Sequence, residues 1–412
     1  MEKGGVSLLP IQGLKVLDLT QILAGPYCTM VLADMGAEVT KIEPFPHGDN
    51  SRGMGPFING ESYSFAMVNR NKKSIALDLK SEKGLGIFKK LANESDIIIE
   101  NFRPGVTEKL GIDYNSMKRI NPGIIYTSIS GFGQTGPYKN KGGLDIIAQG
   151  MVGFMSMTGE QGRGPAKFGI AINDIAAGVT ALYSILGAYV HKLKTGEGQY
   201  IDTSLIESGL AWTVWESAAF FGSGEIPSPN GTRHRRSAPY QAYRTKDGYV
   251  TVGTASERLW IRFCHDVIKR PDWLEHPLYA EKQNRLKNVD QLQEDIEEIL
   301  KVETTSYWVT RLDQAGVPGG PVYTYDQAVN DPHILDREMV VEMEHPILGE
   351  IKTLGIPSKF SATPLRIREP APWLGQHSTE TLKELGYSQE EVDRLYEDGV
   401  VFNKFSEEIK SN

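Results

Sequence analysis

The stretch Gly13-Leu-Lys-Val-Leu-Asp-Leu-Thr-Gln-Ile-Leu-Ala-Gly-Pro-Tyr-Cys-Thr-Met-Val-Leu-Ala-Asp-Met-Gly-Ala-Glu-Val-Thr-Lys-Ile-Glu43 decides the fold class of this chain. Residues 16–20 and 38–43 are short, β-rich runs that read as strands. Residues 24–33 between them read as a helix, with Pro26 in a tolerated first-turn position. A strand, a helix and a second strand in this order form the unit from which parallel sheets are built.

The same alternation continues along the chain. Further strands are predicted at residues 74–79, 96–102 and 123–130, and Ser81 is expected to cap a helix that runs to about Asn93. The sequence therefore predicts an α/β fold with a doubly wound parallel sheet. Later segments are expected to form a strand at 199–203, an apolar helix at 205–221, β-structure at 339–354 and a surface helix at 388–396.

Composition changes after a linker at residues 222–231. Residues 240–253 read as a hairpin turning at Asp247-Gly248, and charged amphipathic helices follow. We expect a large domain at 1–225, a smaller α+β domain at 226–329, and a C-terminal segment at 330–412 that returns to the large domain.

Bulk properties exclude several classes of function. The chain has 412 residues and a net charge of −8, which argues against a nucleic-acid partner because such binding relies on a basic surface. Its two cysteines and eight scattered histidines predict neither a disulfide framework nor a metal site. No apolar run suits a membrane span or a signal peptide, so no membrane partner and a cytoplasmic location are expected.

The pair Asn173-Asp174 opens a long segment that is almost free of charge and is predicted to be a buried helix. Aspartate and asparagine are common helix N-caps, so local sequence favours a capping role for one of them. Two basic clusters, at 70–73 and 233–236, are more often solvated loop charges than binding sites.

Ligands of parallel sheets bind at the carboxyl ends of the strands. Here those ends include residues 77–80, 101–105 and 130–136. The dinucleotide, P-loop and serine-elbow motifs are missing from the sequence. Arg103 and Lys109 flank Pro104-Gly105 at a strand end. This position is a better geometry for phosphate binding than an ordinary loop.

Taken together, several short sequence motifs make the chain resemble the class III CoA-transferases, the family that includes formyl-CoA transferase. The resemblance covers nearly the whole length. Each motif is weak evidence by itself, but the order and spacing of the motifs together are strong evidence. They include residues 13–20, 24–26, 36–43, 71–80, 100–105, 131–137, 195–199 and 316–321.

The resemblance implies that Asp174 is the catalytic nucleophile, and that coenzyme A, as an acyl-CoA, is the co-substrate. A free carboxylic acid would be the second small-molecule partner. The resemblance also implies a Rossmann-like large domain and a homodimer of two chains threaded through each other as interlocked rings. Residues matching the family's CoA-binding segments are Leu77, Asp78, Lys80, Asn101, Phe102, Arg103 and Lys109.

This sequence departs from formyl-CoA transferase at the expected acid site. Leu23 stands where that enzyme has an active-site glutamine, and Pro44 replaces a basic residue. The residues 232–236 lie about where a glycine-rich loop covers the nucleophile. We therefore expect Arg235 and Arg236, together with Asp145, near the acid substrate, where paired arginines suit a dicarboxylate such as oxalate or succinate.

Two alternatives follow from the same resemblance. An α-methylacyl-CoA racemase shares the fold, but its Gly-His-Asp motif reads Gly143-Leu144-Asp145 here, so one of the two bases is missing. A non-catalytic CoA-binding protein would use Asp174 only as a cap. The sequence does not identify the acyl donor or the acceptor acid.

Overall fold

The computed structural model describes residues 8–405, which form two compact units. The first unit contains the residues up to Phe154, Lys167–Glu225 and the residues from Leu335 onward. The second contains Met155–Ala166 and Ile226–Ile334. The first unit is therefore assembled from three separate stretches of the chain.

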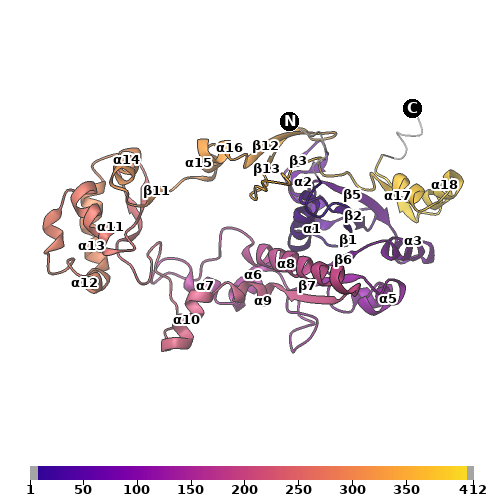
Figure 1. Cartoon of the computed structure of the whole chain (residues 1–412), viewed down its shortest axis with the longest axis horizontal. Helices are drawn as coiled ribbons and strands as arrows, with labels where there is room; N and C mark the ends of the chain where they lie inside the picture. The colour runs from indigo at the N-terminus through magenta and orange to yellow at the C-terminus, as the bar shows by residue number, and fades with distance from the viewer. Residues whose placement is uncertain (1–7, 406–412) are drawn as a thin grey trace. The chain divides into compact units, whose positions relative to one another are not determined.

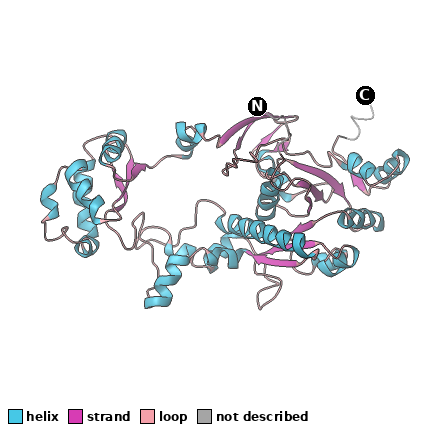
Figure 2. Cartoon of the chain, viewed as in Figure 1, coloured by secondary structure: helices cyan, strands magenta, loops and turns pink. Residues whose placement is uncertain are grey.

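A sheet with helices around it forms the centre of the first unit (Figures 1 and 2). It has seven strands in the order β14-β5-β2-β1-β6-β7-β8. Six strands are parallel and β14 runs antiparallel to β5 at one edge. Successive parallel strands are added outward from β1 in one direction up to β5 and then in the other from β6 onward. The strands are β1 (Lys15–Asp18), β2 (Glu38–Glu43), β5 (Lys72–Leu77), β6 (Ile97–Glu100), β7 (Ile125–Ser130), β8 (Tyr200–Ser204) and β14 (Val401–Phe402).

Neighbouring residues of a strand point to opposite sides of the sheet. Apolar side chains therefore lie on both faces, and helices cover each face. Val16 packs into one core and Leu17 into the other, and Ile97 and Ile98 divide in the same way. The core containing Val16 is covered by α1 (Ala24–Asp34), α6 (Asp145–Met151), α8 (Ile172–Thr195) and α9 (Leu205–Ala211). The opposite core is covered by α3 (Glu82–Asn93), α5 (Tyr114–Ile120), α17 (Ser378–Glu384) and α18 (Gln389–Glu397). The prediction of a mixed α/β fold with a large parallel sheet is confirmed.

One predicted helix is wrong in its extent. Residues 205–221 do not form a single helix, because the chain breaks between α9 and α10 (Val214–Ser223). The hydroxyl of Thr213 donates to the carbonyl oxygen of Leu210 at 2.8 Å, a side-chain bond that competes with the helical hydrogen-bond ladder.

The second unit has its own apolar core around a small antiparallel sheet. Strands β9 (Tyr240–Arg244) and β10 (Tyr249–Gly253) form the hairpin predicted from Asp247-Gly248, and β11 (Gly319–Pro321) pairs with β10. Trp260, Trp273 and Trp308 are buried in this core. Its main helices are α11 (Glu257–Arg262), α12 (Lys282–Lys287), α13 (Val289–Leu300) and α14 (Thr305–Ala315).

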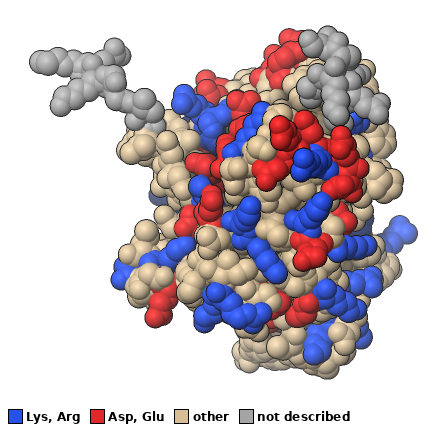
Figure 3. Space-filling view, turned by 90° about the vertical axis from the view of Figure 1, so that its right-hand side faces the viewer, with Lys and Arg blue, Asp and Glu red and all other residues tan. Residues whose placement is uncertain are grey.

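The remaining α-helices and strands are short. They are β3 (Phe57–Ile58), β4 (Glu61–Ser62), α2 (Tyr63–Ala66), α4 (Val106–Leu110), α7 (Phe154–Met157), α15 (Tyr325–Val329), α16 (Pro332–Asp336), β12 (Val340–His345) and β13 (Gly349–Leu354). The antiparallel pair β12 and β13 and the helix α18 agree with the predictions for residues 339–354 and 388–396. The face drawn in Figure 3 mixes lysine and arginine with aspartate and glutamate, so it carries no extended basic field.

Candidate active site

The carboxyl ends of β1 and β6, where the strand order reverses, are tied together by side-chain bonds. The amide of Asn101 accepts from the backbone nitrogen of Gln21 at 2.8 Å and donates to the carbonyl oxygen of Gln21 at 2.8 Å. The next residue, Ile22, has a φ of +71°, which a β-branched residue rarely adopts. Its backbone nitrogen donates to Asp49 at 3.0 Å. The turn that leads from β1 into α1 is thus strained and held from two sides.

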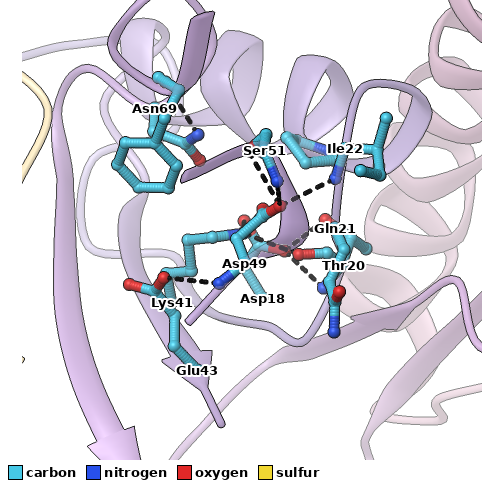
Figure 4. A network of polar contacts seen from close by, with 12 residues as sticks. Asp18, Thr20, Gln21, Ile22, Lys41, Glu43, Asp49, Ser51 and Asn69 are labelled. Atoms are coloured by element: carbon cyan, nitrogen blue, oxygen red, sulfur yellow. Dashed lines mark hydrogen bonds and ion pairs between the residues drawn. The ribbon is translucent and has the colours of Figure 1, made fainter. Parts of the chain in front are cut away.

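A network of buried charges lies beneath this turn (Figure 4). Lys41 donates to the carbonyl oxygen of Thr20 at 2.6 Å and pairs with Asp49 at 2.9 Å. Burial disfavours its charge, but Asp18 and Asp49 outweigh that cost and raise the pKa of Lys41. Lys72 pairs with Asp18 at 3.1 Å, and burial lowers the pKa of Lys72 to about 8. Paired charges of this kind fix the strand ends below the site.

The expectation that the cluster at 70–73 is solvated loop charge is wrong. Arg70 and Lys72 are both 3% exposed. Arg70 pairs with Asp34 at 2.7 Å and also donates to the carbonyl oxygen of Leu354. These partners come from distant parts of the chain, so local sequence gave no sign of them.

Asp174 lies in the first turn of α8 and is not the helix N-cap. The N-cap is Ala171, which makes no side-chain bond, and Asp174 is the third helical residue. The capping interaction comes instead from another helix, because Asp145 on α6 accepts from the backbone nitrogen of Asn173 at 2.8 Å. The interpretation of Asn173 or Asp174 as the cap is therefore corrected.

Burial sets the ionisation of Asp174. Burial, with a smaller contribution from the negative charge of Asp145, raises the pKa of Asp174 to about 7. A helix N-terminus by itself favours an ionised carboxylate. In the structure the loss of hydration outweighs that effect, and the carboxyl group titrates near neutral pH.

Asp145 is itself held from behind by Gln149, one turn further along α6. The side-chain nitrogen of Gln149 donates to Asp145 at 2.6 Å, and its oxygen accepts from the backbone nitrogen of Phe168 at 2.8 Å. Both oxygens of Asp145 are therefore used within the protein, one by Asn173 and one by Gln149. Sequence reasoning missed Gln149, although its spacing of four residues from Asp145 places both on one helix face.

The first turn of α1 packs against α8 close to Asp174. A side chain at Gly178 would stand 2.6 Å from the carbonyl oxygen of Ala24 and 3.2 Å from the ring of Tyr27. Gly178 follows Asp174 by one helical turn, or about 6 Å along the axis. The clamped turn at 21–23, the start of α1 and Asp174 therefore form one continuous region of the first unit.

The residues expected to bind CoA lie along the same edge of the sheet in two groups. Those at the end of β5 are separated from those after β6 by β2 and β1, a span of about 14 Å at ordinary strand spacing. In the first group Leu77 is 1% exposed, Asp78 is half-buried and Lys80 is exposed.

In the second group the side-chain amide of Asn101 is hydrogen-bonded to the backbone of Gln21. Phe102 is half-buried and packs against the core. Arg103 and Lys109 are exposed cations, and a side chain at Gly142 would stand 3.5 Å from the guanidinium of Arg103. The glycine-rich stretch before Asp145 therefore lies beside the second group.

Arg235 and Arg236 belong to the second unit. The guanidinium of Arg235 donates to the carbonyl oxygen of Ser228 at 2.5 Å, and Arg236 is exposed. Arg233 is committed to α13, where it pairs with Asp290 at 2.6 Å and donates to Gln293. The three arginines of the 233–236 cluster thus have different environments.

Three other features bear on the site. Both polar atoms of the fully buried Asn173 side chain lack a partner among residues 8–405, and the amide packs against the bare Cα of Gly209. Within that same range no cluster of histidine, cysteine and acidic side chains is suited to a metal ion. A cavity of about 950 Å³ opens at the opposite, amino-terminal edge of the sheet, where its lining mixes Lys15 and Arg366 with Glu38 and Glu94.

Among the helices that the structure describes, none has the length and apolar character to cross a membrane.

Comparisons with known proteins agree on one family. The model of CoA-transferase family III matches residues 11–378. The human protein named succinyl-CoA:glutarate CoA-transferase is 38% identical over 397 residues, covering 96% of this chain and 90% of its own length. The acetyl-CoA:oxalate CoA-transferase of Acetobacter aceti is 36% identical, covering 85% of this chain and 89% of that protein.

A solved structure gives the same answer for the fold. The crystal structure of a CAIB/BAIF family protein from Brucella suis superposes with a TM-score of 0.83 at 34% sequence identity. The match covers 92% of this chain and 99% of that one.

Proposed function

Because the chain belongs to CoA-transferase family III, we propose that this CoA-transferase moves CoA from an acyl-CoA thioester to a dicarboxylic acid, with Asp174 as the nucleophile. The acid substrates in the names of the two relatives, glutarate and oxalate, are both dicarboxylic acids. Succinyl-CoA is the first donor to test, because the human relative is named for it.

Dicarboxylate recognition would need cationic groups to bind the carboxylate that does not react. Arg235 and Arg236 are the candidates in this chain, since Arg233 already pairs with Asp290. A guanidinium binds a carboxylate through two parallel hydrogen bonds, which gives both energy and orientation. Asp145, with both oxygens bonded inside the protein, acts in this proposal through Asp174 rather than as a direct substrate contact.

The reaction proceeds by covalent exchange on Asp174. The carboxylate attacks the thioester carbonyl, the carbon–sulfur bond breaks, and CoA leaves as a thiolate with the acyl group on Asp174 as a mixed anhydride. The thiolate then attacks the aspartyl carbonyl, releasing the free acid and leaving an enzyme–CoA thioester. An acceptor carboxylate attacks that thioester, which expels the thiolate and forms a second mixed anhydride. The thiolate then attacks the acceptor carbonyl of this anhydride, giving the new acyl-CoA and the free carboxylate of Asp174.

The single observation that carries the proposal is the state of Asp174 itself. It is a partly buried carboxyl group with a pKa of about 7, and among residues 8–405 no group donates a hydrogen bond to its side chain. A carboxylate with few hydrogen bonds and a raised pKa is a better nucleophile than an ordinary surface aspartate. The burial that raises the pKa also limits hydrolysis of the anhydride and thioester.

The CoA moiety is proposed to lie along the carboxyl ends of β5, β2, β1 and β6. Lys80, Arg103 and Lys109 supply exposed cations for its phosphates. Asn101 contributes by clamping Gln21, so that the turn between β1 and α1 is preformed when CoA binds.

The test combines trapping with a substrate panel. Incubation with succinyl-CoA followed by hydroxylamine and peptide mass spectrometry is expected to modify Asp174, and Asp174→Ala is expected to remove the adduct. Glutarate, oxalate and other dicarboxylates are expected to accept CoA, whereas matched monocarboxylates are poor acceptors. Exchange of the α-proton without an adduct would instead indicate a racemase, and CoA binding with neither signal would indicate a binding protein.

The proposed assembly is a homodimer. Large apolar side chains on and beside α9 and α10 are exposed in the single chain, with Trp215 at 80% and Phe221 at 83%. Exposed apolar surface of this kind marks an interaction site. Light scattering is expected to give twice the chain mass, and a monomeric mass at micromolar concentration would contradict the dimer.

A further inference from the structure

We infer that Gln149 is a positioning residue for the proposed CoA transfer, because it holds the carboxylate of Asp145 against the first turn of α8 and so fixes the surroundings of Asp174. The inference rests on the proposed function, which makes Asp174 the nucleophile. It assigns a role to a residue that would not itself touch substrate.

The side chain of Gln149 is fully buried and uses both ends of its amide. The nitrogen donates to Asp145 at 2.6 Å and to the carbonyl oxygen of Ile170 at 3.3 Å. The oxygen accepts from the backbone nitrogen of Phe168 at 2.8 Å. One side chain therefore joins α6 to the segment that leads directly into α8.

The amide of Gln149 supplies two N–H donors and one acceptor without a change of protonation, whereas a hydroxyl has a single donor. The site needs a donor toward the carboxylate of Asp145 and an acceptor toward the backbone nitrogen of Phe168. An apolar residue of similar length would leave Asp145, Phe168 and Ile170 with fewer partners. A glutamate would need a proton to face Asp145.

The consequence for Asp174 follows from the second oxygen of Asp145. That oxygen accepts from the backbone nitrogen of Asn173 at 2.8 Å, the peptide group next to Asp174. With one oxygen bonded to Gln149 and the other to Asn173, the carboxylate of Asp145 cannot rotate. Its charge and its capping bond are both kept at a fixed place beside the nucleophile.

The other acidic side chains on the elements around α8 have partners of their own. Asp34 is paired with Arg70, Asp202 accepts from the backbone of Gln134, and Glu207 bonds Ser204. Only the charge of Asp145 accompanies burial as a cause of the raised pKa of Asp174. The remaining titratable side chains on α1, α8, β7 and β8 are Tyr27, Cys28, Tyr183, Tyr189, His191, Lys192, Lys194, Tyr126 and Tyr200.

The main test is Gln149→Met, with Gln376→Met as the matched control. Gln376 lies in the same unit and also accepts from a backbone nitrogen, that of Trp373, but it lies in the segment before α17. In Gln149→Met the freed Asp145 is expected to leave Asp174, which lowers the pKa of Asp174 and moves the acid limb of kcat to lower pH by about half a unit or more. We expect kcat to fall about tenfold or more, with KM for the acyl-CoA within about twofold.

A purely structural role for Gln149 predicts a different result. If Gln149 only stabilised the fold, less of the variant would be folded, and the apparent kcat would fall by the same factor at every pH. The midpoint of the acid limb would then be unchanged, as expected for Gln376→Met. An unchanged midpoint in folded Gln149→Met would therefore overturn the inference.

Gln149→Glu keeps the shape of the side chain and serves if the methionine variant does not fold. Two carboxyl groups at hydrogen-bond distance share one proton, so the acid limb set by Asp174 is expected to stay near its wild-type position and activity to fall at high pH as the shared proton leaves. Absence of this new alkaline limb would count against the inference.

A measurement without turnover separates the inference from the proposed function. Carbon-13 NMR of aspartate-labelled protein follows the carboxyl titration of Asp174, assigned by its loss in Asp174→Asn. A lower midpoint in Gln149→Met supports the positioning role even if no CoA ester is turned over. An unchanged midpoint in a protein that does turn over CoA esters refutes the positioning role alone.

Discussion

Replacing Asp174 by asparagine is expected to stabilise the folded protein at pH 8 while abolishing turnover. The carboxyl group has a pKa of about 7 in the folded chain against an ordinary value of 3.8. Above pH 7 the folded state therefore carries a poorly hydrated negative charge that the unfolded chain exposes to water. An amide of the same shape removes that cost.

The magnitude follows from the difference between the two pKa values. About three pH units correspond to about 4 kcal/mol as an upper limit at 1.36 kcal/mol per unit. Asp174 is partly exposed, so water screens the charge and about 2 kcal/mol is the expected gain. For a chain of 412 residues this corresponds to a rise in Tm of about 2 °C.

The size of this stabilisation changes with pH in a defined window. Because the folded pKa lies above the unfolded one, the folded state binds more protons between about pH 4 and pH 7, and wild-type stability falls as the pH rises through that range. The advantage of Asp174→Asn is therefore largest at pH 8 and small at about pH 4.5.

Scanning fluorimetry and urea unfolding at fixed protein concentration measure this difference. Asp113→Asn is a control of opposite sign: despite some burial, hydrogen bonds from Ser116 lower the pKa of Asp113. If Asp174→Asn were less stable than the wild type at both pH values, by the roughly 1 kcal/mol typical of a lost cap, the reasoning would be refuted.

Three further predictions concern the pH dependence of turnover, the buried charges beside β1 and the binding of the acceptor acid. The wild-type kcat/KM should rise with pH through a midpoint near 7, because in the proposed mechanism only ionised Asp174 attacks the thioester; a flat profile from pH 5 to 8 would contradict this. Lys72→Met should lower the free energy of unfolding by about 3 kcal/mol, since it leaves buried Asp18 short of a partner, and Asp18→Asn in the same chain should recover part of the loss in urea unfolding. The double variant of Arg235 and Arg236 to alanine should raise KM for a dicarboxylate acceptor about tenfold and leave KM for the acyl-CoA unchanged; equal effects on both would exclude a specific role in acceptor binding.

The strands were predictable because each signal is local. The runs that became β1, β2, β5 and β6 are short, β-rich and followed by helical segments or turns. Ser81 was also correctly predicted as a cap, since its hydroxyl accepts from the backbone nitrogen of Gly84 at 3.0 Å. Signals of this kind need no knowledge of distant residues.

The chemistry around Asp174 was less predictable because it depends on long-range contacts. Asp145 lies 28 positions before Asn173, and nothing local shows that it caps α8. The burial of Arg70 and Lys72 likewise depends on Asp34 and Asp18, 36 and 54 positions away. The break at Thr213 required knowing that its hydroxyl binds the carbonyl oxygen of Leu210.

The edge strand β14 has a consequence for the order in which this protein matures on the ribosome. It pairs with β5, and α17 and α18 bury their apolar faces in the same core, although they are translated more than 300 residues after β5. Until that late segment emerges, one edge of β5 is without its partner and part of one sheet face is uncovered. The second unit can complete its own core during that interval, whereas the first must wait. Nascent chains halted near residue 334 should therefore recruit chaperones and be cleaved readily by proteases in the first unit.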